Sequence, residues 1–222
     1  KIIKKISKKF KLIVVDDGSN DSTSKMLNFF KIECIINKEN IGYEKSLIKA
    51  FKYTIKKYPN TKNIITFDAD GEHKTSDLDR IIMFCKIKKP ILLICNRKSL
   101  NRFSEKFVNY FFKFKFNLED PLSGFKVYNL KILKKYLNKI KPDHFLVNLA
   151  KDICTHKHKV LNYPIKCNTI KNRQPRVGNY LLSNIKILKI LLIIWIMNSN
   201  KYYNFAKNEL FPICRSITGK GT

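Results

Sequence analysis

The sequence predicts an α/β fold with a mostly parallel sheet and helices on both of its faces. Short apolar runs rich in β-branched residues alternate with amphipathic segments through the first half of the chain, which is the pattern of β–α–β units. Carboxylates follow two of these runs, where parallel sheets bind their ligands. The 222 residues, 44% of them hydrophobic, can build a sizeable core and exclude a disordered chain.

The strands are predicted from short apolar runs that end at turn-forming or polar residues. Four lie in the first half of the chain and one lies later, at residues 11–15, 33–36, 63–67, 91–95 and 160–165. Between them, the segment at 44–58 places Leu47, Phe51 and Ile55 four residues apart, so that they share one face of a helix. Further helices are predicted at 1–9, 22–30 and 76–86.

The aromatic-rich segment after residue 101 supports two interpretations. Phe112, Phe114 and Phe116 alternate as they do in a strand with one face in water, but the whole run is equally compatible with a helix. Residues 180–197 are strongly apolar, yet their uninterrupted part is too short to span a bilayer. We expect a packing helix or one that lies on a membrane surface.

The charge of the chain is unusual, because 45 lysines and arginines face 17 acids and give a net charge of +28. Such a charge attracts polyanions, which include nucleic acids, anionic membranes and phosphorylated substrates. The chain is also rich in isoleucine, asparagine, phenylalanine and tyrosine, which share A/T-rich codons with lysine. We attribute most lysines to this bias, which makes the scarcer arginines more informative.

The six cysteines form no CxxC pair and have no zinc-ligand spacing. They therefore predict neither a disulfide framework nor a structural zinc site. The lack of a disulfide framework indicates a reducing, cytosolic compartment.

Two acidic loops are the candidate sites. Asp68, Asp70 and Glu72 alternate after a predicted strand, and on an extended chain alternate side chains point the same way. Three hard oxygen ligands would suit Mg²⁺ or Mn²⁺. Asp16 and Asp17 form the second loop. The alternatives are a solvated acidic turn for the first loop and a turn with a helix cap for the second.

The segments VVDDGSNDST, NKENIGY, TFDADGEH and DPLSGFKVY follow one another in this order. Together they resemble family 2 glycosyltransferases with the GT-A fold, and most closely the dolichyl- or polyprenyl-phosphate sugar transferases. The resemblance covers about residues 10–178. It implies a nucleotide-sugar donor, bound through a divalent metal, and transfer of the sugar with inversion.

The resemblance also implies roles for residues on the donor side. Asp17, with its neighbour Asp16, matches the acid that contacts the base and ribose of the nucleotide, and Gly42 matches the turn where the backbone approaches it. Asp68 and Asp70 match the pair that holds metal and diphosphate. Glu72 stands where a further metal ligand is common.

The acceptor remains open between two classes. A saccharide hydroxyl needs a general base, and Asp120 matches the acid that faces the acceptor. A lipid phosphate is already anionic and instead needs cations, best supplied by arginine forks. The candidates for that phosphate are Arg97, Arg102, Lys126, Arg173 and Arg176.

The expected organisation is a catalytic domain at 1–178, an apolar helix at 179–200 and a tail at 201–222. The family's usual first strand, with its IPxYNE-like motif, has no counterpart here, so we expect an N-terminal truncation in which that strand is missing. The tail at 209–222 resembles the opening of an aminopeptidase-like family, which suggests a fusion or a mis-joined reading frame; the alternative is an unrelated tail.

The predicted function is thus sugar transfer for cell-surface glycans, peripheral to the cytosolic face of a membrane. The alternatives are an inactive remnant of a transferase and, less favoured, a basic protein that binds nucleic acid; no nucleic-acid partner is expected.

Overall fold

The computed structural model describes residues 2–100, 102–139, 145–168, 184–185 and 188. The chain divides into two compact units, residues 1–100 with 109–173 and residues 101–108 with 174–222. Every β-strand of the described residues belongs to the first unit. The domain bounds predicted at 178 and 200, and most of the predicted apolar helix and tail, lie outside the described residues.

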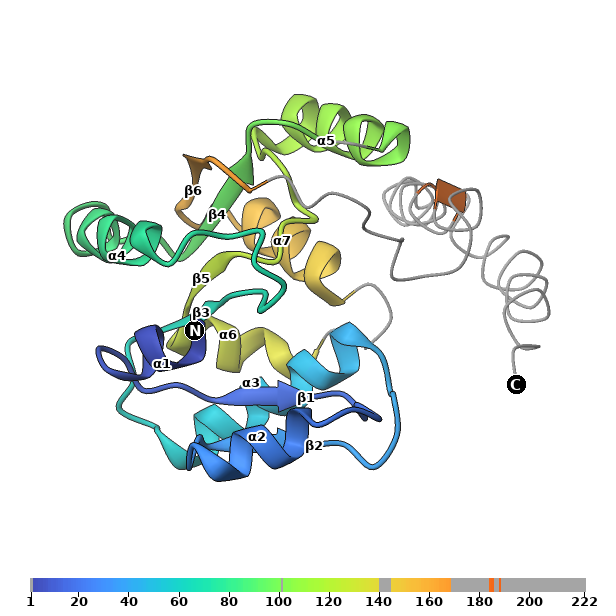
Figure 1. The fold of residues 1–222 in the computed structure, drawn as a ribbon. Helices are drawn as coiled ribbons and strands as arrows, with labels where there is room; N and C mark the ends of the chain where they lie inside the picture. Colours follow the sequence, from blue (N-terminus) through green and yellow to red (C-terminus); the bar gives the residue numbers. More distant parts are fainter. Residues whose placement is uncertain (1, 101, 140–144, 169–183, 186–187, 189–222) are drawn as a thin grey trace. The chain divides into compact units, whose positions relative to one another are not determined.

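The first half of the chain alternates helices and short strands (Figure 1). Its elements are α1 (Ile2–Ser7), β1 (Val14–Asp16), α2 (Thr23–Phe29), β2 (Cys34–Ile36), α3 (Tyr43–Lys57), β3 (Asn63–Thr66), α4 (Ser76–Lys88) and β4 (Leu92–Arg97). The second half adds α5 (Phe103–Phe116), β5 (Lys126–Asn129), α6 (Leu130–Leu137), α7 (Phe145–Thr155) and β6 (Val160–Ile165). The predicted strands are confirmed with small shifts of their ends, and the aromatic run is a helix, so its strand interpretation is wrong.

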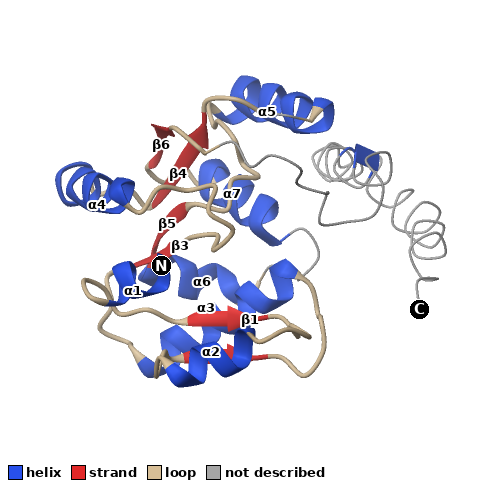
Figure 2. Cartoon of the chain, viewed as in Figure 1, coloured by secondary structure: helices blue, strands red, loops and turns tan. Residues whose placement is uncertain are grey.

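The strands form two sheets, drawn in red in Figure 2. β1 and β2 pair in parallel, with Val15 opposite Ile35. The larger sheet has the order β3-β5-β4-β6. β5 runs antiparallel to both of its neighbours, whereas β4 and β6 are parallel, so β3, β4 and β6 share one direction. The α/β class is confirmed, and β5, which the sequence pattern did not predict, makes the sheet mixed.

The core is centred on β4. Leu92, Leu93, Ile94 and Cys95 are all 0% exposed, as expected for a strand buried on both faces, which appears in sequence as a continuous apolar run. Each such side chain contributes about 1.5–3 kcal/mol through burial. Helix α4 adds buried Ile81 to the same cluster. This core fixes the end of β4, and the candidate site starts there.

Within the described residues, no helix combines the length and the apolar character needed to cross a membrane.

Candidate active site

Asp17 holds the loop before α3 onto the end of β1. Its Oδ1 accepts hydrogen bonds from Asn37 Nδ2 at 2.9 Å, Ser46 Oγ at 2.7 Å and the Ile41 amide at 3.0 Å, and its Oδ2 accepts from the Gly42 amide at 3.0 Å. Burial alone would raise the pKa of Asp17, but these hydrogen bonds outweigh burial and lower it. The structure therefore shows a positioning role for Asp17, and its predicted contact with a nucleotide stays a prediction.

Asp16 lies inside its own loop. It is 3% exposed, and its two oxygens accept from the Ser19 amide at 3.0 Å and from Ser24 Oγ at 2.6 Å. Burial opposes ionisation of Asp16, yet the hydrogen bonds from these serines lower its pKa. The Asp16 carboxylate thus closes the turn before α2, and its expected place at the nucleotide stays a prediction.

Two glycines shape the backbone around these aspartates. At Gly18, whose φ is +74°, an added Cβ would stand 2.5 Å from the Glu39 carbonyl carbon, so the two loops touch backbone to backbone. At Gly42, whose φ is +91°, an added Cβ would meet nothing within 4 Å. Gly42 is therefore required by its left-handed conformation, and the space beside it is open.

The acidic loop after β3 is turned rather than extended. Gly71 has a φ of +86°, and the Glu72 amide donates to Asp70 Oδ1 at 3.1 Å. Asn168 holds the far side of the turn, since its amide donates to the Glu72 carbonyl at 2.9 Å. Among the described residues no three carboxylate, histidine or cysteine side chains are arranged to hold an ion. The chain bends between Asp68 and Glu72, so their convergence does not follow from an extended backbone, and the role of Asp68, Asp70 and Glu72 as metal ligands stays a prediction.

Asp68 packs against the segment that leads into β5. A Cβ added to Gly124 would lie 2.3 Å from Asp68 Oδ2 and 2.6 Å from its Cγ. The neighbouring Thr66 Oγ1 donates to the Gly124 carbonyl at 2.8 Å. The absence of a side chain at Gly124 thus makes room for the Asp68 carboxylate. Two motifs that are far apart in the sequence form one site.

Asp120 and Arg97 form a two-pronged ion pair at the end of β4. Arg97 Nε lies 2.8 Å from Asp120 Oδ2, and Arg97 Nη2 lies 2.9 Å from Oδ1. The Arg97 amide also donates to Oδ2, at 3.0 Å, and Asp120 is 3% exposed. Both oxygens of the Asp120 carboxylate are thus engaged by Arg97. This geometry makes Asp120 the residue that orients Arg97, and its expected role as a general base stays a prediction.

Lys126 is buried and does not reach the surface. It is 1% exposed, and its Nζ donates to the Ser123 carbonyl at 2.6 Å. Burial lowers the pKa of Lys126 to about 8, although the charges of Asp120 and Asp68 act in the opposite direction. The expectation that Lys126 binds an acceptor phosphate stays a prediction, and in this structure its ammonium group binds the Ser123 carbonyl. Its charge acts on the site from within the core.

His73 is a site neighbour that the sequence analysis missed. It is 3% exposed, and its ring packs on Phe67 and Phe125 with centroids 5.6 Å and 5.3 Å away. Its Nδ1 lies 3.8 Å from Cys167 Sγ. Burial lowers the pKa of His73, against the pull of nearby carboxylates that include Asp68 and Asp70. His73 thus anchors the acidic loop to the apolar core, and its place right after that cluster was the available signal.

For three of the predicted phosphate-binding arginines the structure gives no place relative to this site. Arg102 precedes α5 and belongs to the second unit. Arg173 and Arg176 lie outside the described residues. Of the predicted acceptor-side residues, the structure therefore brings Arg97, Asp120 and Lys126 together beside Asp68.

Comparison with known proteins identifies the class. The model of the family described as "Glycosyl transferase family 2" matches residues 1–139. This is more than half of the chain, so the protein belongs to glycosyl transferase family 2 and is a glycosyltransferase.

Curated relatives come from an archaeon. The uncharacterized protein MJ1222 of Methanocaldococcus jannaschii is 27% identical over 197 residues, which cover 82% of this chain and 79% of that protein. The uncharacterized protein MJ0544 of the same organism is 34% identical over 91 residues, 37% of this chain and 38% of its own length.

Solved structures show the fold. Glucosyl-3-phosphoglycerate synthase from Mycobacterium tuberculosis, in complex with Mn²⁺, uridine diphosphate and glucosyl-3-phosphoglycerate, aligns with a TM-score of 0.62 at 14% identity over 84% of this chain and 72% of that one. Its complex with Mn²⁺ and UDP-glucose aligns with a TM-score of 0.59 at 14% identity, over 82% and 72% of the two chains. At this identity the likeness is one of fold, which is the GT-A fold.

Proposed function

We propose that the protein transfers a sugar, with inversion, from a metal-bound nucleotide-sugar to an acceptor phosphate, foremost a polyprenyl or dolichyl phosphate, in the synthesis of cell-surface glycans. The observation that carries the proposal is the Arg97–Asp120 pair beside Asp68. It supplies an oriented cation at the end of β4, and both oxygens of the Asp120 carboxylate are engaged with that cation.

The donor end of the proposal rests on Asp68 and Asp70. Mg²⁺ and Mn²⁺ are commonly bound by one or two carboxylates together with substrate phosphates, rather than by a cage made of protein alone. The seating of Asp68 against Gly124 and the absence of a three-ligand cage among the described residues both fit that mode. When bound, the ion would neutralise the charge that develops on the leaving diphosphate. The Mycobacterium tuberculosis enzyme, with the same fold, was crystallised with Mn²⁺ and UDP-glucose.

The nucleotide would lie beside the loop that Asp17 holds. The four hydrogen bonds to Asp17 fix the backbone from Asn37 to Gly42, and the space beside Gly42 is open. Exposed backbone in a fixed loop can contact a base or ribose without first paying an ordering entropy. In this view Asp17 shapes the nucleotide pocket through the loop.

A phosphate acceptor fits the chemistry of Arg97 better than a hydroxyl acceptor does. A phosphate oxygen is already anionic and attacks without a base, whereas a hydroxyl needs a proton acceptor. A guanidinium held by Asp120 keeps a fixed orientation, and its planar set of N–H donors suits the oxygens of a phosphate. The synthase with the same fold was crystallised with phosphoglyceric acid, a phosphate-bearing compound.

Helix α5 supports placement at a membrane surface. Its exposed aromatic residues recur at helical spacing along one face, with exposed fractions from 51% to 87%: Phe103, Phe107, Tyr110 and Phe114. Exposed lysines at 106, 113 and 115 flank them. A helix with aromatic residues on one side and lysines around them is typical of the interface of an anionic membrane.

The donor half is tested by calorimetric titration with UDP in the presence and absence of Mn²⁺. We expect binding that requires Mn²⁺ and is lost in Asp70→Asn. The matched control is Asp79→Asn, because Asp79 is exposed on α4 and pairs only with Lys9 in the described structure. Equal UDP binding by both variants would contradict the metal role, and no binding by the unmodified chain would favour the inactive remnant.

The acceptor half is tested with a polyprenyl phosphate and the matching polyprenol, using UDP- and GDP-sugars as donors. We expect product only with the phosphate. Asp120→Asn should lower kcat about tenfold through a loosened Arg97 and leave the shape of the pH–rate profile unchanged, whereas loss of a general base costs roughly 10²–10⁴-fold. Loss of the acidic limb of the pH–rate profile in Asp120→Asn would contradict this proposal and support a hydroxyl acceptor, with Asp120 as its general base.

A further inference from the structure

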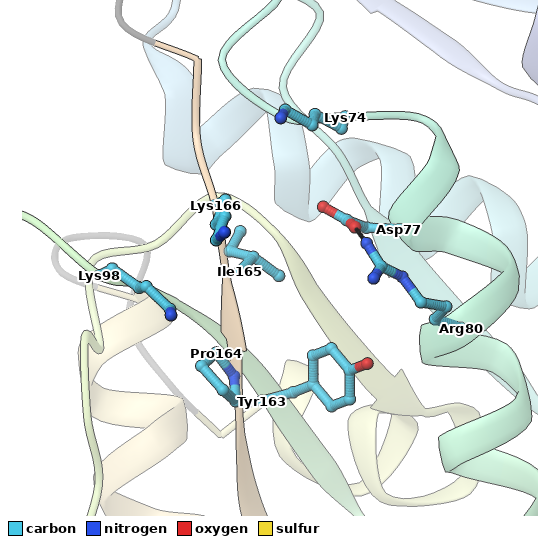
Figure 3. A pocket seen from close by; sticks show the side chains of 8 residues that line it. All are labelled: Lys74, Asp77, Arg80, Lys98, Tyr163, Pro164, Ile165 and Lys166. Atoms are coloured by element: carbon cyan, nitrogen blue, oxygen red, sulfur yellow. Dashed lines mark hydrogen bonds and ion pairs between the residues drawn. The ribbon is translucent and has the colours of Figure 1, made fainter.

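A hollow lined by basic residues lies between α4 and the end of β6 (Figure 3). Its volume is about 270 Å³. Lys98 and Lys166 border it on one side and Arg80 lies across from them, while Tyr163 stands between. None of these residues belongs to the predicted donor or acceptor sites. The hollow therefore calls for an explanation of its own.

The charges around the hollow are not balanced by the chain. Its lining carries four cations but a single carboxylate, Asp77, and that carboxylate pairs with Arg80. Within the described part of the chain, the side chains of Lys74, Lys98 and Lys166 have no hydrogen-bond or ion-pair partner. Like charges that face one space repel one another. An anion in the hollow would remove that repulsion.

We propose that this hollow binds a phosphoryl group, separately from the diphosphate of the nucleotide-sugar. A phosphoryl group carries about −1.5 to −2 charges on three oxygens, which matches three separate ammonium groups better than a single carboxylate does. The volume of about 270 Å³ also leaves room for an organic part next to the phosphate. The ligand is thus a phosphorylated small molecule or a lipid phosphate headgroup.

The same chain segments carry the hollow and the candidate active site. Lys74 follows the acidic loop, and Lys98 follows Arg97 directly. Lys166 precedes Cys167, whose Sγ lies 3.8 Å from His73 Nδ1. A phosphoryl group in the hollow would therefore bind the segments that also position the acidic loop. Binding of a phosphoryl group in the hollow does not require the proposed sugar transfer. Either proposal can therefore be wrong while the other holds.

The test compares two charge-matched double variants. Lys98→Gln/Lys166→Gln removes two cations from the hollow, and Lys86→Gln/Lys88→Gln removes two exposed cations from the last turn of α4. The probes are inorganic phosphate, measured by calorimetry, and phosphatidylcholine vesicles with and without phosphatidic acid, measured by cosedimentation. Ionic strength is held constant, because a chain of net charge +28 attracts anions without specificity.

We expect the dissociation constant of at least one probe to rise about tenfold in the hollow variant and less than about twofold in the control. Weakening toward free phosphate assigns the site to a soluble phosphorylated compound, and weakening toward the vesicles alone assigns it to a lipid headgroup. Equal weakening in both variants, or none in the hollow variant, overturns the proposal.

Thermal melting checks that both variants fold, which the exposure of all four lysines leads us to expect. Mn²⁺-dependent UDP binding is measured on the same samples. It should be unchanged in the hollow variant, which separates this site from the donor site.

Discussion

The two acidic loops resemble each other in sequence, but the structure uses them differently. After β1, Asp17 accepts four hydrogen bonds from its own chain and Asp16 accepts two. After β3, the Asp68 carboxylate lies against the bare backbone of Gly124, and Gly71 turns the loop. The comparison teaches that a carboxylate surrounded by its own amides builds a loop. The Asp68 carboxylate is instead positioned by the space that Gly124 leaves, as the proposed binding of a metal there requires.

The variant Gly124→Ala tests this difference between the two loops most directly. The added Cβ would stand 2.3 Å from Asp68 Oδ2 and force the carboxylate away. Because misplacement of a site group by about 1 Å can cost 10²-fold, we expect transferase activity to fall about hundredfold. The control is Gly71→Ala, where an added Cβ meets nothing within 4 Å and the cost is only that of the positive φ. Similar activities of the two variants in a transferase assay would mean that the seat of Asp68 is unimportant.

The first loop should respond in stability rather than in chemistry. Asp17→Asn removes the charge and places an amide donor among four donors, so we expect the free energy of unfolding to fall by about 2 kcal/mol. Asp70→Asn should change it by less than about 0.5 kcal/mol. Urea denaturation at neutral pH measures both. A larger loss in Asp70→Asn than in Asp17→Asn would reverse the roles assigned to the loops.

Glu33 offers a reference carboxylate outside both loops. Burial would raise its pKa, but hydrogen bonds from Tyr58, Lys57 and Tyr53 prevail and lower it to about 2. A carboxyl whose pKa is depressed in the folded state stabilises the fold above its unfolded pKa of about 4.5. That stabilisation is lost as the pH falls from about 4.5 to about 2.

We therefore expect Glu33→Gln to cost about 1 kcal/mol at pH 7 and almost nothing near pH 2, if the chain still folds there. Urea denaturation followed across this pH range measures the difference. A cost independent of pH would show that packing, not charge, is what Glu33 supplies.

The local pattern of apolar residues predicted most helices and strands, because buried side chains recur with the period of the element that carries them. The run before Cys95 and the amphipathic spacing around Phe51 are of this kind. β5 was missed because it begins with Lys126, a charged residue that the pattern places at the surface but that is buried in the structure.

The site was harder to predict, since its contacts join distant segments. Arg97 and Asp120 are 23 positions apart, and nothing in either segment alone indicates that they pair. The acidic loop was predicted to be extended because its carboxylates alternate along the sequence. The positive φ of Gly71 turns the backbone, so that this alternation no longer places them on one side. The sequence thus indicated which residue types gather at the strand ends, while their partners depend on the folded sheet.

Pro164 has a consequence for how this chain behaves among other copies of itself. It stands in β6, opposite Asn96, and β6 ends the order of the larger sheet within the described residues. Proline offers no amide hydrogen, so it removes one donor from a strand edge. An exposed lysine, Lys166, follows the strand directly. Proline residues and charged side chains are two means by which proteins prevent edge-to-edge association of sheets. The edge formed by β6 is therefore a poor template for aggregation.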